Sequence, residues 1–191
     1  AVSEASDGAA AGHAVVFAVI LGTGCGGGIA VNGLPWAGPN AIGGEWGHNP
    51  LPWPRPEWDE TPGPRHWDGQ YGSIEAYCSG RGLARDHHKV TGDPLTGEQI
   101  VARAAAGDGP CNATLGRFED RLARGLASVI NLLDPEVIVV GGGLSRIERL
   151  YRHVPALWDQ WVFSDEVRTR LLPAMHGDSS GVRGAAWLWP A

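Results

Sequence analysis

The chain has 191 residues, and its 15 lysines and arginines against 21 aspartates and glutamates give it a formal net charge of −6. This balance argues against non-specific nucleic-acid binding, which depends on clustered basic side chains that neutralise phosphates. The three cysteines, Cys25, Cys78 and Cys111, are odd in number and widely spaced, which predicts a reduced, cytoplasmic setting rather than a disulfide framework.

The first hundred residues begin with a short helical pattern and two strands. Residues 3–12 are typical of the end of an alanine-rich helix that closes on glycine, so we expect either a processed terminus or, in preference, a piece of a longer protein. Val15 to Leu21 is an apolar run of strand length that is too short to span a bilayer and follows no basic leader, so we expect neither a membrane span nor a signal peptide. Gly28 to Gly33 predicts a second strand that ends in an Asn-Gly turn, which makes a hairpin.

A loop rich in proline and tryptophan follows. Residues 49–67 contain six prolines and three tryptophans, which excludes a helix and predicts an extended loop. Trp53, Trp58 and Trp67 carry too much apolar surface for a disordered loop. We therefore expect this loop to lie over a site or a subunit interface.

The second half alternates helices and strands. The strongest helical stripe predicts a helix from Pro110 to Leu133, and Val137 to Val140 predicts another buried strand. Ser145 and Glu148 have the spacing of a capping box that opens the next helix, and a last helix is predicted over residues 181–189. Strands that alternate with helices indicate an α/β fold.

The glycine-rich residues 22–28 fit the Gly-x-Gly-x-x-Gly pattern of dinucleotide-binding folds, but a strand follows them where that fold requires a helix. A glycine-rich hairpin can instead offer backbone N–H groups and a hydroxyl to phosphate, as in actin-like ATPases. Gly22, Thr23 and Gly24 are therefore candidate nucleotide-binding residues. The alternative is a tight hairpin that binds no ligand.

Gly141, Gly142 and Gly143 stand at the carboxyl end of a predicted strand, where open α/β sheets bind their ligands. Glycines there let a nucleotide base or ribose approach the backbone, although a plain strand-to-helix turn would need them equally. Glu45 and His48 are three residues apart, share a face if they form a helical turn, and could hold neighbouring sugar hydroxyls. The alternative is an ordinary surface pair. Phosphate and hydroxyl recognition together indicate a kinase that acts on a polyol or sugar.

Five segments together resemble the ROK family (repressors, open reading frames and kinases), with the closest likeness to its bacterial fructokinase or manno(fructo)kinase branch. The resemblance covers the whole chain and rests on residues 21–28, 32–33, 43–53, 131–143 and 176–186.

This resemblance implies a lobe of the actin-like ATPase (ribonuclease H-like) fold, with a mixed sheet and flanking helices. It implies a homodimeric, two-lobed kinase that uses ATP and Mg²⁺ to phosphorylate a hexose, with fructose or mannose as the expected substrate. Glu45, His48 and Glu75 match the residues that hold sugar hydroxyls. Thr23 with its glycines matches a phosphate loop, and residues 141–143 match the adenosine region.

The sequence departs from the family in its zinc motif. Family kinases join a sugar-binding histidine to Cys-x-Cys-Gly-x-x-Gly-Cys, whereas residues 66–73 here keep both glycines and lack all three thiolates. His48, His66 and Asp68 could form a weaker three-ligand site, but structural zinc sites of this kind depend on thiolates. We expect no metal, and we expect the packing of prolines and tryptophans in residues 50–67 to order the loop instead.

A second departure concerns the first lobe, whose phosphate loop and catalytic aspartate have no counterpart in residues 1–191. Glu4 and Asp7 do not match that aspartate. We therefore expect residues 1–191 to be a single C-terminal lobe that needs the N-terminal lobe as its partner and is inactive alone. The alternatives are a sugar-sensing repressor of the same family and a non-catalytic remnant.

Overall fold

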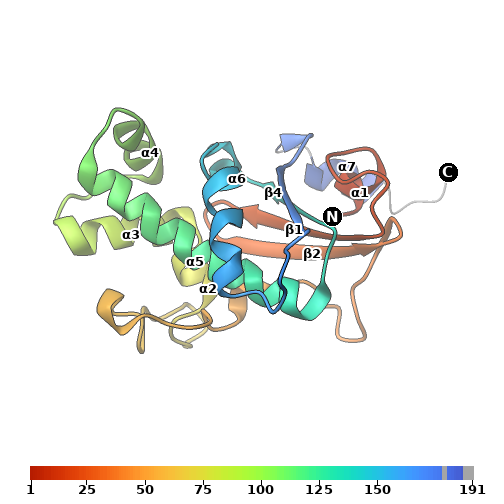
Figure 1. Cartoon of the computed structure of the whole chain (residues 1–191), viewed down its shortest axis with the longest axis horizontal. Coiled ribbons are helices and arrows are strands. Elements are labelled where there is room, and N and C mark those ends of the chain that lie inside the picture. Colours follow the sequence, from red (N-terminus) through yellow and green to blue (C-terminus); the bar gives the residue numbers. More distant parts are fainter. Residues whose placement is uncertain (178–179, 187–191) are drawn as a thin grey trace.

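The computed structural model describes residues 1–177 and 180–186. Its centre is a mixed five-stranded sheet in the order β3-β2-β1-β4-β5 (Figure 1). Strands β1 and β2 are antiparallel, as are β2 and β3, whereas β1 pairs in parallel with β4, and β4 with β5. The strands are β1 Val15–Leu21, β2 Cys25–Val31, β3 Leu34–Pro35, β4 Val137–Gly141 and β5 Arg170–Pro173.

Helices cover both faces of this sheet. Because side chains alternate along a strand, Phe17, Val19 and Leu21 of β1 join the large core under α5, while Val16 joins a smaller core beside α1. Helices α3 and α4 pack on the first half of α5 and extend away from the sheet (Figure 1). The α-helices are α1 Val2–Ser6, α2 Ile74–Tyr77, α3 Gly80–Thr91, α4 Gly97–Ala105, α5 Gly109–Leu133, α6 Leu150–His153 and α7 Ser180–Ala186, and the 3₁₀ helices are η1 Trp46–His48, η2 Pro56–Trp58, η3 Gly143–Arg146 and η4 Pro155–Gln160.

The predicted hairpin is confirmed, but its second strand starts earlier than expected. Strand β2 begins at Cys25 rather than Gly28, so three glycines lie inside it. The reason is close backbone packing, because a Cβ on Gly27 would come within 2.6 Å of the Gly44 carbonyl oxygen. The Asn-Gly turn is also confirmed, since Asn32 and Gly33 both have positive φ angles, of 51° and 77°.

Two other predictions need correction. The N-terminal helix ends at Ser6, and turns fill the chain up to Gly12. Ser145 caps no helix, because it lies within η3 and its hydroxyl donates to the Gly142 carbonyl oxygen at 2.7 Å. The next helix, α6, starts at Leu150 without a side-chain cap. Helix α7 ends at Ala186 in the described part, and the rest of the predicted last helix lies outside it.

The loop of residues 49–67 is irregular apart from η2, as predicted, and pairs through isolated bridges at Pro50 with Ser73 and at Arg65 with Tyr71. Trp67 is 78% exposed and Trp53 is 42% exposed, yet both rings make contacts: Trp53 stacks on Trp161, and Trp67 lies against His48 with ring centroids 5.7 Å apart. Within the described ranges, none of the helices has both the length and the apolar character that a membrane crossing requires.

Candidate functional site

The turn between β1 and β2 is fixed on both sides. The Gly80 N–H at the start of α3 donates to the Gly22 carbonyl oxygen at 2.7 Å, and the Gly22 N–H donates to that of Gly24 at 3.0 Å. On the other side, the Glu75 Oε2 atom accepts a hydrogen bond from the Cys25 N–H at 2.8 Å. A Cβ on Gly24 would come within 2.6 Å of that oxygen, so this glycine makes room for the carboxylate. The turn therefore connects α3 with Glu75.

The three predicted sugar-binding residues lie in one chain of polar contacts. Glu75 Oε1 lies 2.7 Å from His66 Nε2, and His66 Nδ1 lies 3.1 Å from Asp68 Oδ2 without hydrogen-bond geometry. The same Asp68 oxygen lies 3.3 Å from His48 Nδ1, and His48 Nε2 lies 3.8 Å from Glu45 Oε2. The structure thus brings Glu45, His48 and Glu75 together, with His66 and Asp68 between them, and we call these five residues the polar cluster.

Local packing positions Glu45 and His48. Between them, Trp46 is buried, packs edge-on against Phe17 with ring centroids 5.9 Å apart, and donates its indole N–H to the Gly26 carbonyl oxygen at 3.1 Å. This anchor holds η1 against β2. The side chains of Glu45 and His48 keep 52% and 40% of their surface exposed, so both can still meet a ligand.

The charges within this chain of contacts stabilise one another. A backbone hydrogen bond from Gln70, together with His66 and His48, lowers the pKa of Asp68 to about 2. Burial alone would lower the pKa of His66, but the Glu75 and Asp68 carboxylates outweigh it and the net shift is upward. Burial alone would raise the pKa of Glu75, but the bonds from Cys25 and His66 lower it overall. The Asp68 and Glu75 carboxylates are therefore ionised acceptors at neutral pH, suited to hydroxyl donors.

A cavity of about 990 Å³ lies on the α3 side of the turn. Of the six predicted nucleotide-binding residues, Gly22, Thr23 and Gly143 line it, together with residues of α3, α4 and η3. Gly24, Gly141 and Gly142 are not in its wall. A glycine is required at position 142 by the backbone and its packing, because the φ angle there is 82° and a Cβ would come within 2.5 Å of the Leu21 carbonyl oxygen.

A buried ion-pair network that the sequence analysis missed fastens the loop of residues 49–67 to α5. The Glu60 carboxylate has no exposed side-chain surface and contacts Arg121 Nε at 2.6 Å and Arg124 Nη1 at 2.9 Å. Arg124, also fully buried, donates to the Trp53 carbonyl oxygen at 2.8 Å. The sequence signal for this network is the group of charged residues within the apolar stripe of α5, at Glu119, Asp120, Arg121 and Arg124.

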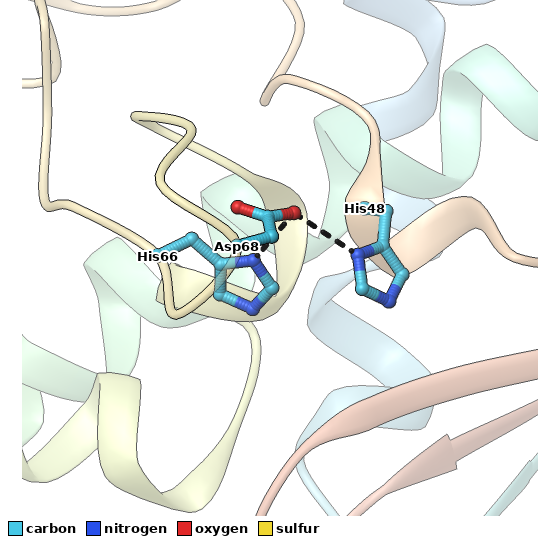
Figure 2. A group of neighbouring side chains, drawn as sticks. All are labelled: His48, His66 and Asp68. Carbon is cyan, nitrogen blue, oxygen red and sulfur yellow. Dashed lines mark hydrogen bonds and ion pairs between the residues drawn. The ribbon is translucent and has the colours of Figure 1, made fainter.

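His48, His66 and Asp68 do converge, with ligand atoms within 4.8 Å of one another (Figure 2). Two features of this cluster do not fit a structural zinc. First, its donors are two imidazoles and one carboxylate with no thiolate, and they contact each other directly. Second, Ser73 stands at the position of a family thiolate, and its hydroxyl oxygen accepts a hydrogen bond from the Ala76 N–H at 3.2 Å. The expected absence of metal therefore stays a prediction that elemental analysis can test.

The mixed sheet with flanking helices has the actin-like ATPase fold, which solved ROK sugar kinases share. The chain belongs to the ROK family, whose model matches residues 1–191. Curated relatives include N-acetyl-D-glucosamine kinases of Pectobacterium atrosepticum, 37% identical over 189 residues, and of Yersinia pseudotuberculosis, 40% identical over 190 residues. Each match covers 98% of this chain and 62% of the relative.

Solved structures agree on the fold. A ROK hexokinase from Thermus thermophilus superposes with a TM-score of 0.84 at 28% identity, covering 98% of this chain and 61% of that one. A ROK glucokinase from Streptomyces griseus, in complex with glucose and AMPPNP, superposes with a TM-score of 0.83 at 29% identity, covering 97% and 64%. The sequence motifs led us to expect a fructokinase or manno(fructo)kinase, whereas these curated relatives are named N-acetylglucosamine kinases.

Proposed function

We propose that the protein containing this chain is an ATP-dependent hexose kinase, and that residues 1–191 supply sugar contacts and one wall of the nucleotide site. One observation carries the proposal: the turn at Gly22 to Cys25 borders the large cavity on one side and is bonded to Glu75 on the other. A phosphoryl donor in the cavity and a sugar at the polar cluster would then meet across a single turn. Phosphoryl transfer depends chiefly on such positioning.

The residues divide between the two substrates in this proposal. Glu45 and His48 hold sugar hydroxyls with their exposed sides, and Glu75 accepts from a further hydroxyl while it fixes the turn. Thr23 and the N–H groups beside Gly22 bind donor phosphates. Among the described residues that line the cavity, Glu98 is the single acid, so Mg²⁺ would be held mainly by the donor's phosphates and water.

N-Acetylglucosamine is the first substrate to test. The curated relatives that bear this name are 37–40% identical to the chain, which places it ahead of the fructose and mannose that the motifs suggested. Hexose is the class that all these sugars share. Which of these hexoses is used also depends on parts of the sugar site outside residues 1–191, in the remainder of the longer protein.

The catalytic base is expected outside the polar cluster and outside the N-terminal helix. Glu4 is buried and accepts hydrogen bonds from the Ala9 and Met175 N–H groups at 2.9 and 3.1 Å. Asp7 pairs with His176 at 3.0 Å and with Arg183. Both carboxylates are therefore committed to structural contacts, which supports a base supplied by the family's first lobe.

A repressor of the same family is the second candidate. A ROK transcriptional regulator superposes with a TM-score of 0.79 at 23% identity, and this similarity shows a shared fold only. A coupled assay of the full-length protein with ATP and each hexose separates the two. We expect ATP-dependent phosphorylation of at least one hexose by the full-length protein and negligible turnover by residues 1–191. Saturable sugar binding without phosphorylation would instead favour the regulator.

A further inference from the structure

One face of α3 forms a cationic wall of the large cavity. Residues 80, 81, 84, 85 and 88 of this helix line it, a spacing that places them on one face. Three arginines in the lining, at positions 81, 85 and 146, are opposed there by one acid, Glu98. The chain as a whole carries a net charge of −6, so this local excess of positive charge runs against its composition. A polyanionic ligand is the chemistry that such a wall favours.

Arg81 is the best placed of these cations for phosphate. Its neighbour Gly80 donates its N–H to the Gly22 carbonyl oxygen at 2.7 Å, which holds Arg81 beside the turn that carries Thr23. Arg81 is exposed, and among the residues that the structure describes it forms no hydrogen bond or ion pair. Its guanidinium therefore keeps all its donors available, in a fork geometry that matches phosphate oxygens.

We propose that Arg81 binds the phosphate chain of the nucleotide donor and so makes the site selective for nucleoside polyphosphates over nucleosides. The proposal rests on the proposed kinase function and assigns a residue that lies outside the five segments on which the family resemblance rests. Arg85 and His88 extend the same face, and α3 advances roughly 10 Å from Arg81 to His88. That length suits an extended nucleotide whose phosphates lie at the Gly22 end.

The test measures by calorimetry the affinities of adenosine, AMP and a non-hydrolysable ATP analogue. Each ligand is bound to the full-length protein and to its Arg81→Gln variant. A lost charge-assisted contact predicts that the affinity for the ATP analogue falls about tenfold or more. The affinity for adenosine is expected to stay within twofold. A merely structural role for Arg81 would instead lower the affinity for all three ligands together.

Two further variants sharpen the test. Arg81→Lys is expected to restore part of the affinity for the ATP analogue, because it keeps the charge without the fork. Lys89→Gln is the matched control, since Lys89 lies on α3 but pairs with Asp59 away from this cavity. Unchanged affinity of Arg81→Gln for the ATP analogue would overturn the inference while leaving the kinase function standing. Failure of the unaltered protein to bind the analogue and to phosphorylate any hexose would overturn both.

Discussion

The Glu75 carboxylate accepts a hydrogen bond from the Cys25 backbone N–H at 2.8 Å, and this bond joins the glycine-rich turn to the polar cluster. One oxygen of Glu75 contacts the turn, and the other contacts His66 at 2.7 Å. A hexose that touches Glu75 would therefore act on the side chain that fixes the glycine-rich turn. The two halves of the proposed reaction share this carboxylate.

Gly24→Ala is expected to disturb that junction. The added Cβ would come within 2.6 Å of Glu75 Oε2, so the carboxylate must move and the Cys25 bond is weakened. We expect the free energy of unfolding to fall by roughly 1–3 kcal/mol in urea denaturation. Gly26→Ala is the matched control, because its Cβ would meet nothing within 4 Å. Equal stability of the two variants would show that the close approach of Glu75 has no energetic consequence.

Gly22→Val separates binding from folding. Gly22 lines the cavity and a Cβ there would meet no protein atom within 4 Å, so the fold can accept a side chain. If donor phosphates approach this backbone, the added atoms occupy their place, and we expect ATP affinity to fall about tenfold with stability changed by less than about 1 kcal/mol. Titration with a fluorescent ATP analogue measures this. Undiminished affinity would move the phosphate site away from the turn.

Glu60→Gln tests the buried network that fastens the loop of residues 49–67. The change leaves the guanidinium groups of Arg121 and Arg124 buried without their carboxylate, and such losses cost about 3–5 kcal/mol. Glu57→Gln serves as the control, because Glu57 lies in the same loop, is 61% exposed and makes a long ion pair with Arg55, 3.7 Å between Oε1 and Nη1. It should cost less than about 1 kcal/mol. Similar urea midpoints for both variants would contradict a structural role for the network.

The same network predicts how stability responds to acid. Burial alone would raise the pKa of Glu60, but its bonds to Arg124 and Arg121 outweigh burial, so its pKa in the folded chain lies below the ordinary 4.5. At a pH between the lowered pKa of Glu60 in the folded chain and the ordinary pKa of 4.5, Glu60 is protonated in the unfolded chain but not in the folded one. The free energy of unfolding therefore falls as the pH drops below about 4.5. Thermal midpoints across this range should fall more steeply for the unaltered protein than for Glu60→Gln. Parallel curves would exclude Glu60 as a contributor.

Zinc content tests whether protein contacts replace the family's metal. Because His48, His66 and Asp68 pair with each other and the loop is fastened through Glu60, we expect well below one zinc per chain in protein purified without chelator. Elemental analysis by mass spectrometry gives the ratio. Stoichiometric zinc would show that two imidazoles and a carboxylate suffice to hold it.

Local patterns predicted much of the fold. The bounds of β1 follow from an unbroken apolar run, and α5 follows from a long helical stripe that ends where Asp134 adopts a positive φ angle of 46°. The start of β2 could not be read in the same way, because Gly27 is required by the approach of Gly44, which is distant in sequence. Glycine runs predict turns, and here tertiary packing placed several of them in a strand.

The site was predicted in part for the same reason. Glu45 and His48 stood out because they are close in sequence, and Glu75 came only from the family resemblance. The contact of Glu75 with Cys25 and the burial of Glu60 against Arg124 join residues about 50 and 64 positions apart, so no local pattern contains them. Ion pairs with α5 add to the expected packing of the loop's tryptophans, since Trp53 stacks on Trp161 and the Arg124 guanidinium lies over the Trp58 ring.

A crystal structure of the full-length protein with N-acetylglucosamine and a non-hydrolysable ATP analogue tests the central claim most directly. The account predicts donor phosphates against Gly22 and Thr23, and sugar hydroxyls within hydrogen-bond distance of Glu45 and His48. A nucleotide bound outside the cavity beside α3, or a sugar that leaves Glu45, His48 and Glu75 untouched, would contradict it.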